Sequence, residues 1–478
     1  MARRSSINQH SINQHSVNQH GVEGAGSDGP GVDPRIVAEL VQRAASPGFD
    51  DWWASVANSG YCTSPVHLTG TAPTGRQIKV LARCKNRRST ICPSCSRLYA
   101  GDTWQLVHRG LLLDPDTDTD TEVGGVRRPV VFATLTAPSY GAVHRAGPCH
   151  PRRRHRCRHA SRTGCGTTHR ADDGAVGTPL CLDCYDYTGH VLFTWHAPEL
   201  WHRYTIALRR ALRRTLREMD ADPTGTRLSY VKIVELQHRG VPHYHAVFRL
   251  DPTGDSTPVP LTGTDLAGLI TRAATATRLR VPGPQSGPVT IGFGEQIDAQ
   301  PLDLDSARGR AVAGYLAKYV TKSVADLGLT PRRLSPHAID RLDVNDFVRR
   351  ILHTIIELSE HPDRAEMVRW LHTLAYRGHV SSKTRQYSTT MGALRANRAT
   401  WQQQARQTCR RATGDAGTGP DDSSLKPDGD GWRFTGIGHA SDGERLLAVS
   451  AAARAGENLQ AARDNRVNRD GDDVAGAR

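Results

Sequence analysis

Residues 231–250 predict a β-hairpin, which constrains the fold more than any other part of the 478-residue chain. Two β-rich runs flank a turn at Arg239-Gly240, so the two strands must lie antiparallel. Residues two apart on a strand point to the same face of the sheet. His243 and His245 therefore present two imidazoles side by side, as two ligands of one divalent metal would be.

The partner strand of this hairpin could supply an oxygen ligand. Glu235 and Gln237 share one of its faces, and Glu235 is the preferred candidate because it carries a charge. Two imidazoles with one carboxylate or amide leave positions open for a substrate oxygen. The simpler alternative for a bare His-x-His pattern is two histidines on a polar sheet face. A metal site therefore needs support from a second group of residues.

That second group lies on a helix predicted within residues 308–322. Tyr315 and Tyr319 are four residues apart, so both hydroxyls emerge from one helical face, one turn apart. Lys318 and Lys322 repeat the spacing beside them. Half-buried packing is the alternative for both tyrosines. If this face meets the hairpin, a tyrosine could attack a metal-bound DNA phosphodiester, and a lysine could offset the developing negative charge.

Two cysteine-rich segments predict structural zinc sites. The first set is Cys62, Cys84, Cys92 and Cys95, and its alternative is a group of unpaired buried thiols. The second set is Cys157, Cys165, Cys181 and Cys184, with Cys149 spare and with His155, His159 or His169 able to replace one cysteine. The second segment has too little apolar content to fold unaided, so we expect zinc to supply its stability.

The net charge of +14 indicates a polyanionic partner. Nucleic acid is favoured over a membrane, because no apolar run approaches the roughly 20 residues that a spanning helix needs. The candidate DNA-binding residues are Arg152, Arg153 and Arg154 in one basic stretch, and Arg377, Lys383 and Arg385 in another. Solvated loops are the alternative for both stretches. The N-terminus has no apolar signal-peptide core, so we expect a cytoplasmic protein whose clustered cysteines bind metal.

Three motifs resemble those of the HUH endonucleases. They are His243-Tyr-His245, Phe132-Ala-Thr-Leu-Thr-Ala-Pro138 and Tyr315-Leu-Ala-Lys-Tyr-Val-Thr-Lys322. Residues 62–398 as a whole look like the replication initiators of Streptomyces-type rolling-circle plasmids and integrative conjugative elements. The spacing of the second cysteine set and the late Arg377-Gly-His379 motif add to this resemblance.

The resemblance implies a fold and an activity. The fold would be α+β, with an antiparallel, RRM- or palm-like HUH nuclease core, zinc-binding Cys-rich insertions and a helical C-terminal region. The activity would be Mg²⁺- or Mn²⁺-dependent nicking of origin DNA, single-stranded or extruded as a hairpin. The nick leaves a 5′-phosphotyrosine and a 3′-hydroxyl that primes a host DNA polymerase, with a host helicase unwinding ahead.

Related initiators have Glu at the position matching Tyr315 and the attacking tyrosine at the position matching Tyr319. We therefore expect Tyr319 to attack first and Tyr315 to act as the second or terminating nucleophile. The chain could instead be a mobilisation relaxase or a transposase, since both use the same chemistry. A third alternative is a non-catalytic, zinc-stabilised DNA-binding protein in which every histidine and tyrosine is structural.

The expected regions follow the composition of the chain. They are a disordered repeat tail at 1–34, a Cys-rich zinc region at 35–125, the HUH nicking domain at 126–325 with its zinc insertion at 144–186, a helical DNA-binding or accessory region at 326–412 and a mostly disordered tail at 413–478. Within them we predict helices at 198–219, 338–359 and 363–374, a strand at 287–298 and a short helix at 444–453.

Overall fold

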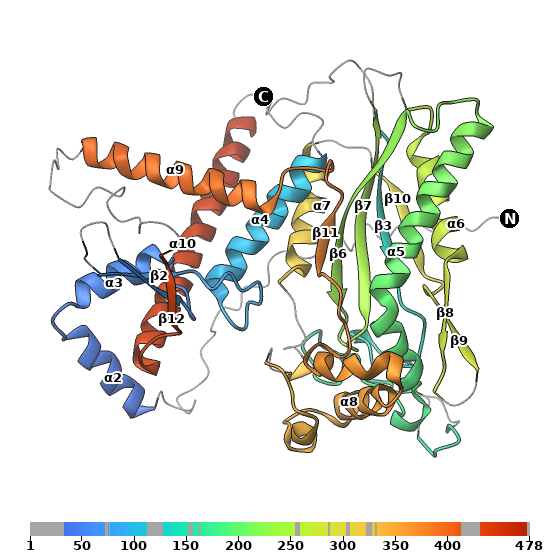
Figure 1. Ribbon diagram of the computed structural model, residues 1–478, viewed down its shortest axis with the longest axis horizontal. Coiled ribbons are helices and arrows are strands. Elements are labelled where there is room, and N and C mark those ends of the chain that lie inside the picture. The colour runs from blue at the N-terminus through green and yellow to red at the C-terminus, as the bar shows by residue number, and fades with distance from the viewer. Residues whose placement is uncertain are drawn as a thin grey trace.

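A five-stranded antiparallel sheet lies at the centre of the protein, with strand order β10-β3-β7-β6-β11 (Figure 1). The strands are β3 (Val130–Leu135), β6 (Thr226–Leu236), β7 (Pro242–Pro252), β10 (Ile297–Pro301) and β11 (Ser381–Lys383). This computed structural model describes residues 33–71, 75, 77–111, 128–151, 156–161, 164–253, 259–284, 287–302, 306–321, 327–329, 332–412 and 431–475. The predicted α+β class with an antiparallel sheet is confirmed.

Both faces of the sheet are covered by helices, because its strands alternate apolar residues on two sides. Tyr244 and Phe248 point into a core shared with α5 (Tyr187–Glu218), α6 (Gly263–Ala276) and α8 (Asp346–Ser359). Ile233 and Val247 point to the other face, where α4 (Pro93–Leu111) and α7 (Ser306–Tyr319) pack. Each side chain of the sheet therefore points either to the face covered by α5 or to the face covered by α7.

Helix α5 is longer than the sequence pattern predicts. It begins at Tyr187 rather than at Pro198, with the Asp186 carboxylate accepting a hydrogen bond from the backbone of Gly189 as N-cap. Residues 190–195 are all buried, so this first part lacks the polar stripe by which an amphipathic helix is recognised. Burial on both sides of Pro198 keeps the helix continuous although proline removes one backbone hydrogen bond.

Within the expected helical region, described residues between 327 and 394 pack into the cores on the two faces of the central sheet. Helix α8 and the 3-10 helix η4 (Pro362–Thr373) contact each other, and β11 adds an edge strand to the sheet. The predicted helix at 338–359 is interrupted, since residues 336–341 form the 3-10 helix η3 and α8 follows. The predicted strand at 287–298 is likewise two strands, β9 (Pro288–Gly292), which pairs with β8 (Arg278–Pro282), and β10.

The two ends of the described chain fold together, so residues 431–475 contain more order than the short helix expected at 444–453, whereas residues 413–430 and 476–478 of the expected tail lie outside the described residues. Strand β12 (Arg433–Ile437) pairs with β1 (Val66–Thr71), which pairs with β2 (Gln77–Ala82). Helix α10 (Asp442–Ala475) packs on α2 (Pro34–Ala44), where Glu444 forms an ion pair with Arg43 at 3.0 Å. These partners lie more than 360 residues apart in sequence, so local composition could not reveal them.

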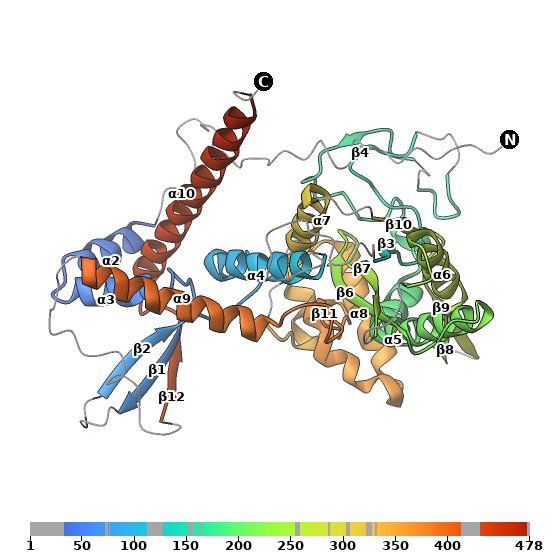
Figure 2. The same ribbon diagram turned by 90° about the horizontal axis from the view of Figure 1, so that it is seen from above.

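Helix α4 connects this N- and C-terminal unit to the central sheet. Figures 1 and 2 show α2, α3 (Phe49–Asn58), α10 and the small sheet on one side, with α4 between them and α7. The remaining long helix, α9 (Met391–Ala412), extends from the sheet side toward the same unit. Among the helices that the structure describes, none combines the length and the apolar character that a membrane span requires.

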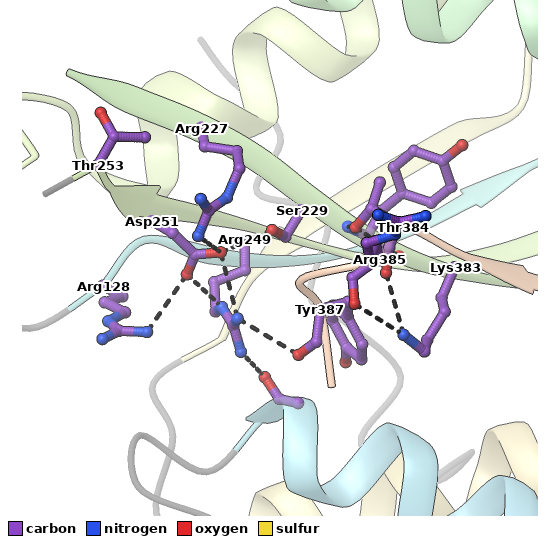
Figure 3. Close-up of polar contacts among 12 residues, drawn as sticks. Arg128, Arg227, Ser229, Arg249, Asp251, Thr253, Lys383, Thr384, Arg385 and Tyr387 are labelled. Carbon is purple, nitrogen blue, oxygen red and sulfur yellow. Dashed lines mark hydrogen bonds and ion pairs between the residues drawn. The ribbon is translucent and has the colours of Figure 1, made fainter. Parts of the chain in front are cut away.

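A buried ion pair fixes α4 to the sheet (Figure 3). The Arg249 guanidinium donates to both carboxylate oxygens of Asp251, at 2.6 and 3.2 Å, and both residues are at most 5% exposed. Arg249 also donates to the backbone carbonyls of Gly110, at the end of α4, and of Tyr387. Ser229 donates to Asp251 at 2.6 Å. One arginine therefore joins β7, α4 and the segment after β11.

Substitution of this arginine tests how much the junction contributes. We expect Arg249→Met to lower the free energy of unfolding by about 3–5 kcal/mol, because it leaves the Asp251 charge buried without its main partner. Urea unfolding followed by circular dichroism measures the change. The control is Arg227→Ala, because Arg227 is 40% exposed and lies 4.0 Å from the same carboxylate, a geometry that contributes about 1 kcal/mol or less. Equal stability of the two variants would contradict the assignment.

Candidate active site

The predicted hairpin is formed by β6 and β7. Glu235 pairs with His243 across the ladder, and the chain reverses through a turn in which the Gly240 amide donates to the Gln237 carbonyl at 2.7 Å. Gly240 has a φ of 82°, a conformation that costs glycine little. The imidazole rings of His243 and His245 lie 4.6 Å apart between centroids. The sequence pattern therefore placed the turn and the paired imidazoles correctly.

Neighbouring strands hold His245 in place. The ring is 2% exposed, and its Nδ1 lies 3.3 Å from the hydroxyl of Thr134 on β3. Phe132, two residues earlier on β3, stacks on the same ring at 6.1 Å. Tyr244 points to the opposite face, where it stacks on Trp201 of α5 at 5.2 Å. The residue between the two histidines thus anchors β7 in the core on the side of the sheet away from the imidazoles.

Both candidate oxygen ligands lie beside the imidazoles. A Glu235 carboxylate oxygen is 3.3 Å from His245 Nε2, and the Gln237 amide nitrogen is 3.3 Å from His243 Nδ1. The Gln237 oxygen accepts a hydrogen bond from Arg239 at 3.0 Å. A cation at this place would replace the contact between Glu235 and His245, whereas a bond to Gln237 would compete with Arg239. This geometry favours Glu235 over Gln237.

Helix α7 brings both tyrosines onto the hairpin. The Tyr319 ring stacks on His245 at 5.0 Å, and the Tyr315 ring meets the same imidazole edge-on at 5.3 Å. The two phenol rings are 4.8 Å apart. Leu316 on the adjacent face of α7 and Val320 directly after the helix are buried against α4 and the sheet, which fixes the rotation of the helix. The two groups of residues proposed from separate motifs therefore form one cluster.

Burial controls the protonation of this cluster. It lowers the pKa of His243 to about 4, with the nearby His245 acting in the same direction. A neutral imidazole is the form that binds a metal. Burial also raises the pKa of Tyr315 and, together with a hydrogen bond to Tyr315, raises the pKa of Tyr319 well above its usual range. Both phenols are therefore protonated at neutral pH.

The predicted basic residues lie in different environments. Lys318 is exposed on α7, one position before Tyr319, and Arg385 is exposed after β11. Arg377 is also exposed, and its guanidinium stacks over the Trp195 ring at 4.4 Å. Lys383 donates to three backbone carbonyls, so its ammonium protons hold the loop after β11 rather than a phosphate. Lys322 and the run Arg152, Arg153 and Arg154 lie outside the described residues.

The first predicted cysteine set converges. The thiols of Cys62, Cys84, Cys92 and Cys95 all lie within 4.8 Å of one another. Two of the sulfur–sulfur distances, from Cys62 to Cys92 and to Cys95, are both 3.7 Å. Tetrahedral zinc with Zn–S bonds of about 2.3 Å requires sulfur separations of about 3.8 Å. Cys62, the most distant member in sequence, is fully buried at the centre of the set.

The second cysteine set differs from the prediction at one position. Cys157, Cys181 and Cys184 gather with His159, whose Nδ1 is 3.2 Å from the sulfur of Cys184. Cys165 lies elsewhere, because its backbone amide bonds to the His150 carbonyl and so places it beside Cys149. His159 was one of the histidines considered as a replacement ligand. The insertion contains five cysteines. Their spacing alone could not show which of them this backbone pairing keeps out of the four-ligand site.

Two comparisons with known proteins are consistent with one another. The family model RepSA, described as "Replication initiator protein, pSAM2", matches residues 48–453. A replication initiator protein of Streptomyces ambofaciens is 37% identical over 463 residues, which cover 91% of this chain and 96% of that protein. No solved structure matches the chain. The chain therefore belongs to the RepSA family of replication initiator proteins, as the resemblance of its motifs predicted.

Proposed function

We propose that this initiator nicks one strand of origin DNA with a tyrosine of α7 and so starts rolling-circle replication. The observation that carries the proposal is the contact of Tyr315 and Tyr319 with His245. A purely structural cluster does not need two phenols, two imidazoles and a carboxylate converging from three elements. The proposed core is that of an HUH endonuclease, with the histidines on β7, Glu235 on β6 and the tyrosines on α7.

His243, His245 and Glu235 are the residues that would hold Mg²⁺ or Mn²⁺. Such an ion, when bound, polarises a non-bridging phosphate oxygen and offsets negative charge on the phosphoryl group. The imidazole of His243 and the carboxylate of Glu235 fit this ion, because burial keeps the His243 ring neutral and so able to donate a lone pair. Gln237 would then remain hydrogen-bonded to Arg239, while its amide nitrogen would release Nδ1 of His243, because a neutral imidazole has one lone pair to donate.

The Tyr319 oxygen would attack phosphorus and form a new O–P bond. The bond from phosphorus to the 3′ oxygen breaks, and that oxygen takes up a proton to become the 3′-hydroxyl primer. The phenol proton must leave as the new bond forms, and it passes through solvent to the departing 3′ oxygen, because Tyr315 is itself protonated and cannot take it up. The product is a 5′-phosphotyrosine that conserves the phosphodiester bond energy for rejoining.

Tyr315 is suited to the second transfer. Its side chain is 41% exposed and it lies one helical turn before Tyr319 on the same face. A second DNA strand could therefore reach it while Tyr319 carries the first. Exposed Lys318 on the same helix would approach the DNA backbone. Origin DNA is the substrate in this proposal, and the primer end would pass to a host polymerase behind a host helicase.

Replacement of the two tyrosines tests the proposal. We expect Tyr319→Phe to reduce nicking of single-stranded origin DNA by at least about 10³-fold, because the nucleophile is lost. Tyr315→Phe should still nick but fail to rejoin or transfer the second strand. Gel assays with Mn²⁺ would follow the nicked product and the covalent protein–DNA adduct.

The control for these variants is Tyr99→Phe, which removes a hydroxyl that contacts Ser381 at 3.2 Å and leaves the cluster intact. It should nick like the wild type. Persistent adduct in the double variant of Tyr315 and Tyr319 would exclude tyrosine catalysis. A wild-type protein that forms neither a nick nor an adduct would instead be a non-catalytic, zinc-stabilised DNA-binding protein. Strand transfer between unrelated molecules without replication would instead favour a relaxase or a transposase.

The third metal ligand is tested by paired substitutions. We expect Glu235→Ala to weaken Mn²⁺ binding by at least about tenfold, since even residues that only orient metal ligands contribute that much. Gln237→Ala should change the affinity less, because the Gln237 oxygen is bonded to Arg239. Isothermal titration calorimetry with Mn²⁺ measures both constants. A larger loss in the Gln237 variant would reverse the assignment.

The pH dependence of metal binding follows from His243. Its pKa of about 4 lies below the ordinary histidine value, so the imidazole is neutral at every pH above that value. A proton therefore competes with the metal only as the pH falls toward 4. We expect Mn²⁺ affinity to change little between pH 7 and about 5 and to fall steeply below it. An NMR titration of the His243 imidazole with a midpoint near 6.5, the ordinary histidine pKa, would contradict the buried environment described for His243.

A further inference from the structure

The residues that the second cysteine set leaves over form a cluster of their own. Strands β4 (Gly147–Pro148) and β5 (Thr168–His169) pair as a short antiparallel ribbon within the Cys-rich insertion. This pairing brings Cys149, at the end of β4, next to Cys165, just before β5. His144 and His169 lie at the same end of the ribbon, with ring centroids 5.0 Å apart. Four potential ligands thus meet at one point.

We propose that His144, Cys149, Cys165 and His169 bind a structural zinc ion distinct from the one at Cys157, His159, Cys181 and Cys184. The four ligand atoms all lie within 4.8 Å of one another. The separations are 3.1 Å between the two imidazole nitrogens, 3.8 Å from Cys149 to His144 and 3.3 Å from Cys165 to His169. Tetrahedral zinc with two sulfur and two nitrogen ligands requires separations of about 3.3–3.8 Å.

A carboxylate outside the cluster supports the proposed zinc site. Asp173 Oδ2 lies 2.6 Å from His169 Nδ1, so His169 directs its other nitrogen, Nε2, at the cluster. Zinc-binding histidines nearly always donate the second ring N–H to such a partner, which fixes the tautomer and the ring orientation. Cys149 and His169 are 5% and 8% exposed, so the ligand pair is shielded from competing water. Two soft thiolates with two imidazoles select zinc among common divalent ions.

The zinc ion proposed at His144, Cys149, Cys165 and His169 would stabilise the turn of the hairpin that carries His243 and His245. The backbone of His144 exchanges hydrogen bonds with the 177–178 segment, at 2.9 and 2.8 Å. Gly177, with a φ of 89°, packs so closely on His238 that a Cβ atom there would lie 2.6 Å from the His238 backbone. The neighbouring Arg239 donates to the carbonyl of Pro138 at 3.4 Å. Zinc at His144 therefore fixes the loop on which the hairpin turn rests.

Zinc counting on the intact protein tests the proposal without any variant. We expect mass spectrometry of the purified full chain to find three zinc ions, one for each cluster. The double variant Cys149→Ser with Cys165→Ser should contain one ion fewer, and Cys181→Ser with Cys184→Ser should lose a different one. The combined variant should lose both. Two ions in the wild type, or Cys165 and Cys181 variants that lose one shared ion, would overturn the proposal.

A milder pair of substitutions keeps the test valid if the cysteine variants fail to fold. We expect Asp173→Asn to retain all four ligands but to lower the affinity for the zinc ion at His144, Cys149, Cys165 and His169 by about 10–100-fold. Competition with a zinc chelator measures this affinity. The matched control is Asp172→Asn, because Asp172 is an exposed neighbour that pairs with Arg170. Equal zinc release from both variants would contradict the role of Asp173. These readouts do not depend on nicking, so they stand or fall separately from the proposed catalysis.

Discussion

The buried pair of Arg249 and Asp251 is the interaction on which the candidate site depends. It lies on the same strand as the histidines, and its guanidinium reaches the carbonyl that ends α4. Helix α4 in turn packs along α7, the helix that carries both tyrosines. Because the ion pair is buried, leaving either partner alone would cost several kcal/mol. The distance between tyrosine and histidine is thus set by contacts well outside the site.

Burial gives the same cluster two opposite electrostatic effects. It keeps His243 neutral, which suits a metal ligand, and it keeps both phenols protonated, which suppresses their reactivity. A tyrosine of this kind becomes a nucleophile only when positive charge arrives near its oxygen. In the proposed mechanism that charge comes with the metal. The protein can therefore carry two nucleophiles a few ångströms apart without modifying itself.

Local periodicity explains which predictions succeeded. The two-residue repeat of a strand places His243 beside His245, and the helical repeat places Tyr315 above Tyr319, whatever the rest of the chain does. The assignment of Cys165 failed because β4–β5 pairing, rather than spacing, decides which thiols meet. Local composition likewise gave no sign of β12, since this strand gains its hydrogen bonds from β1. Thr134 had no signal as a His245 partner before the strand register was known.

The pairing of β12 with β1 has a consequence for biosynthesis. A ribosome delivers β1 early, but the small sheet cannot close until more than 360 further residues have been made. The strands and helices that build the candidate site, up to α7 and β11, all emerge before β12. Domains generally fold as they leave the ribosome. The central sheet can therefore be complete while the first cysteine-rich segment still lacks its edge strand, so translation itself orders the assembly of the initiator.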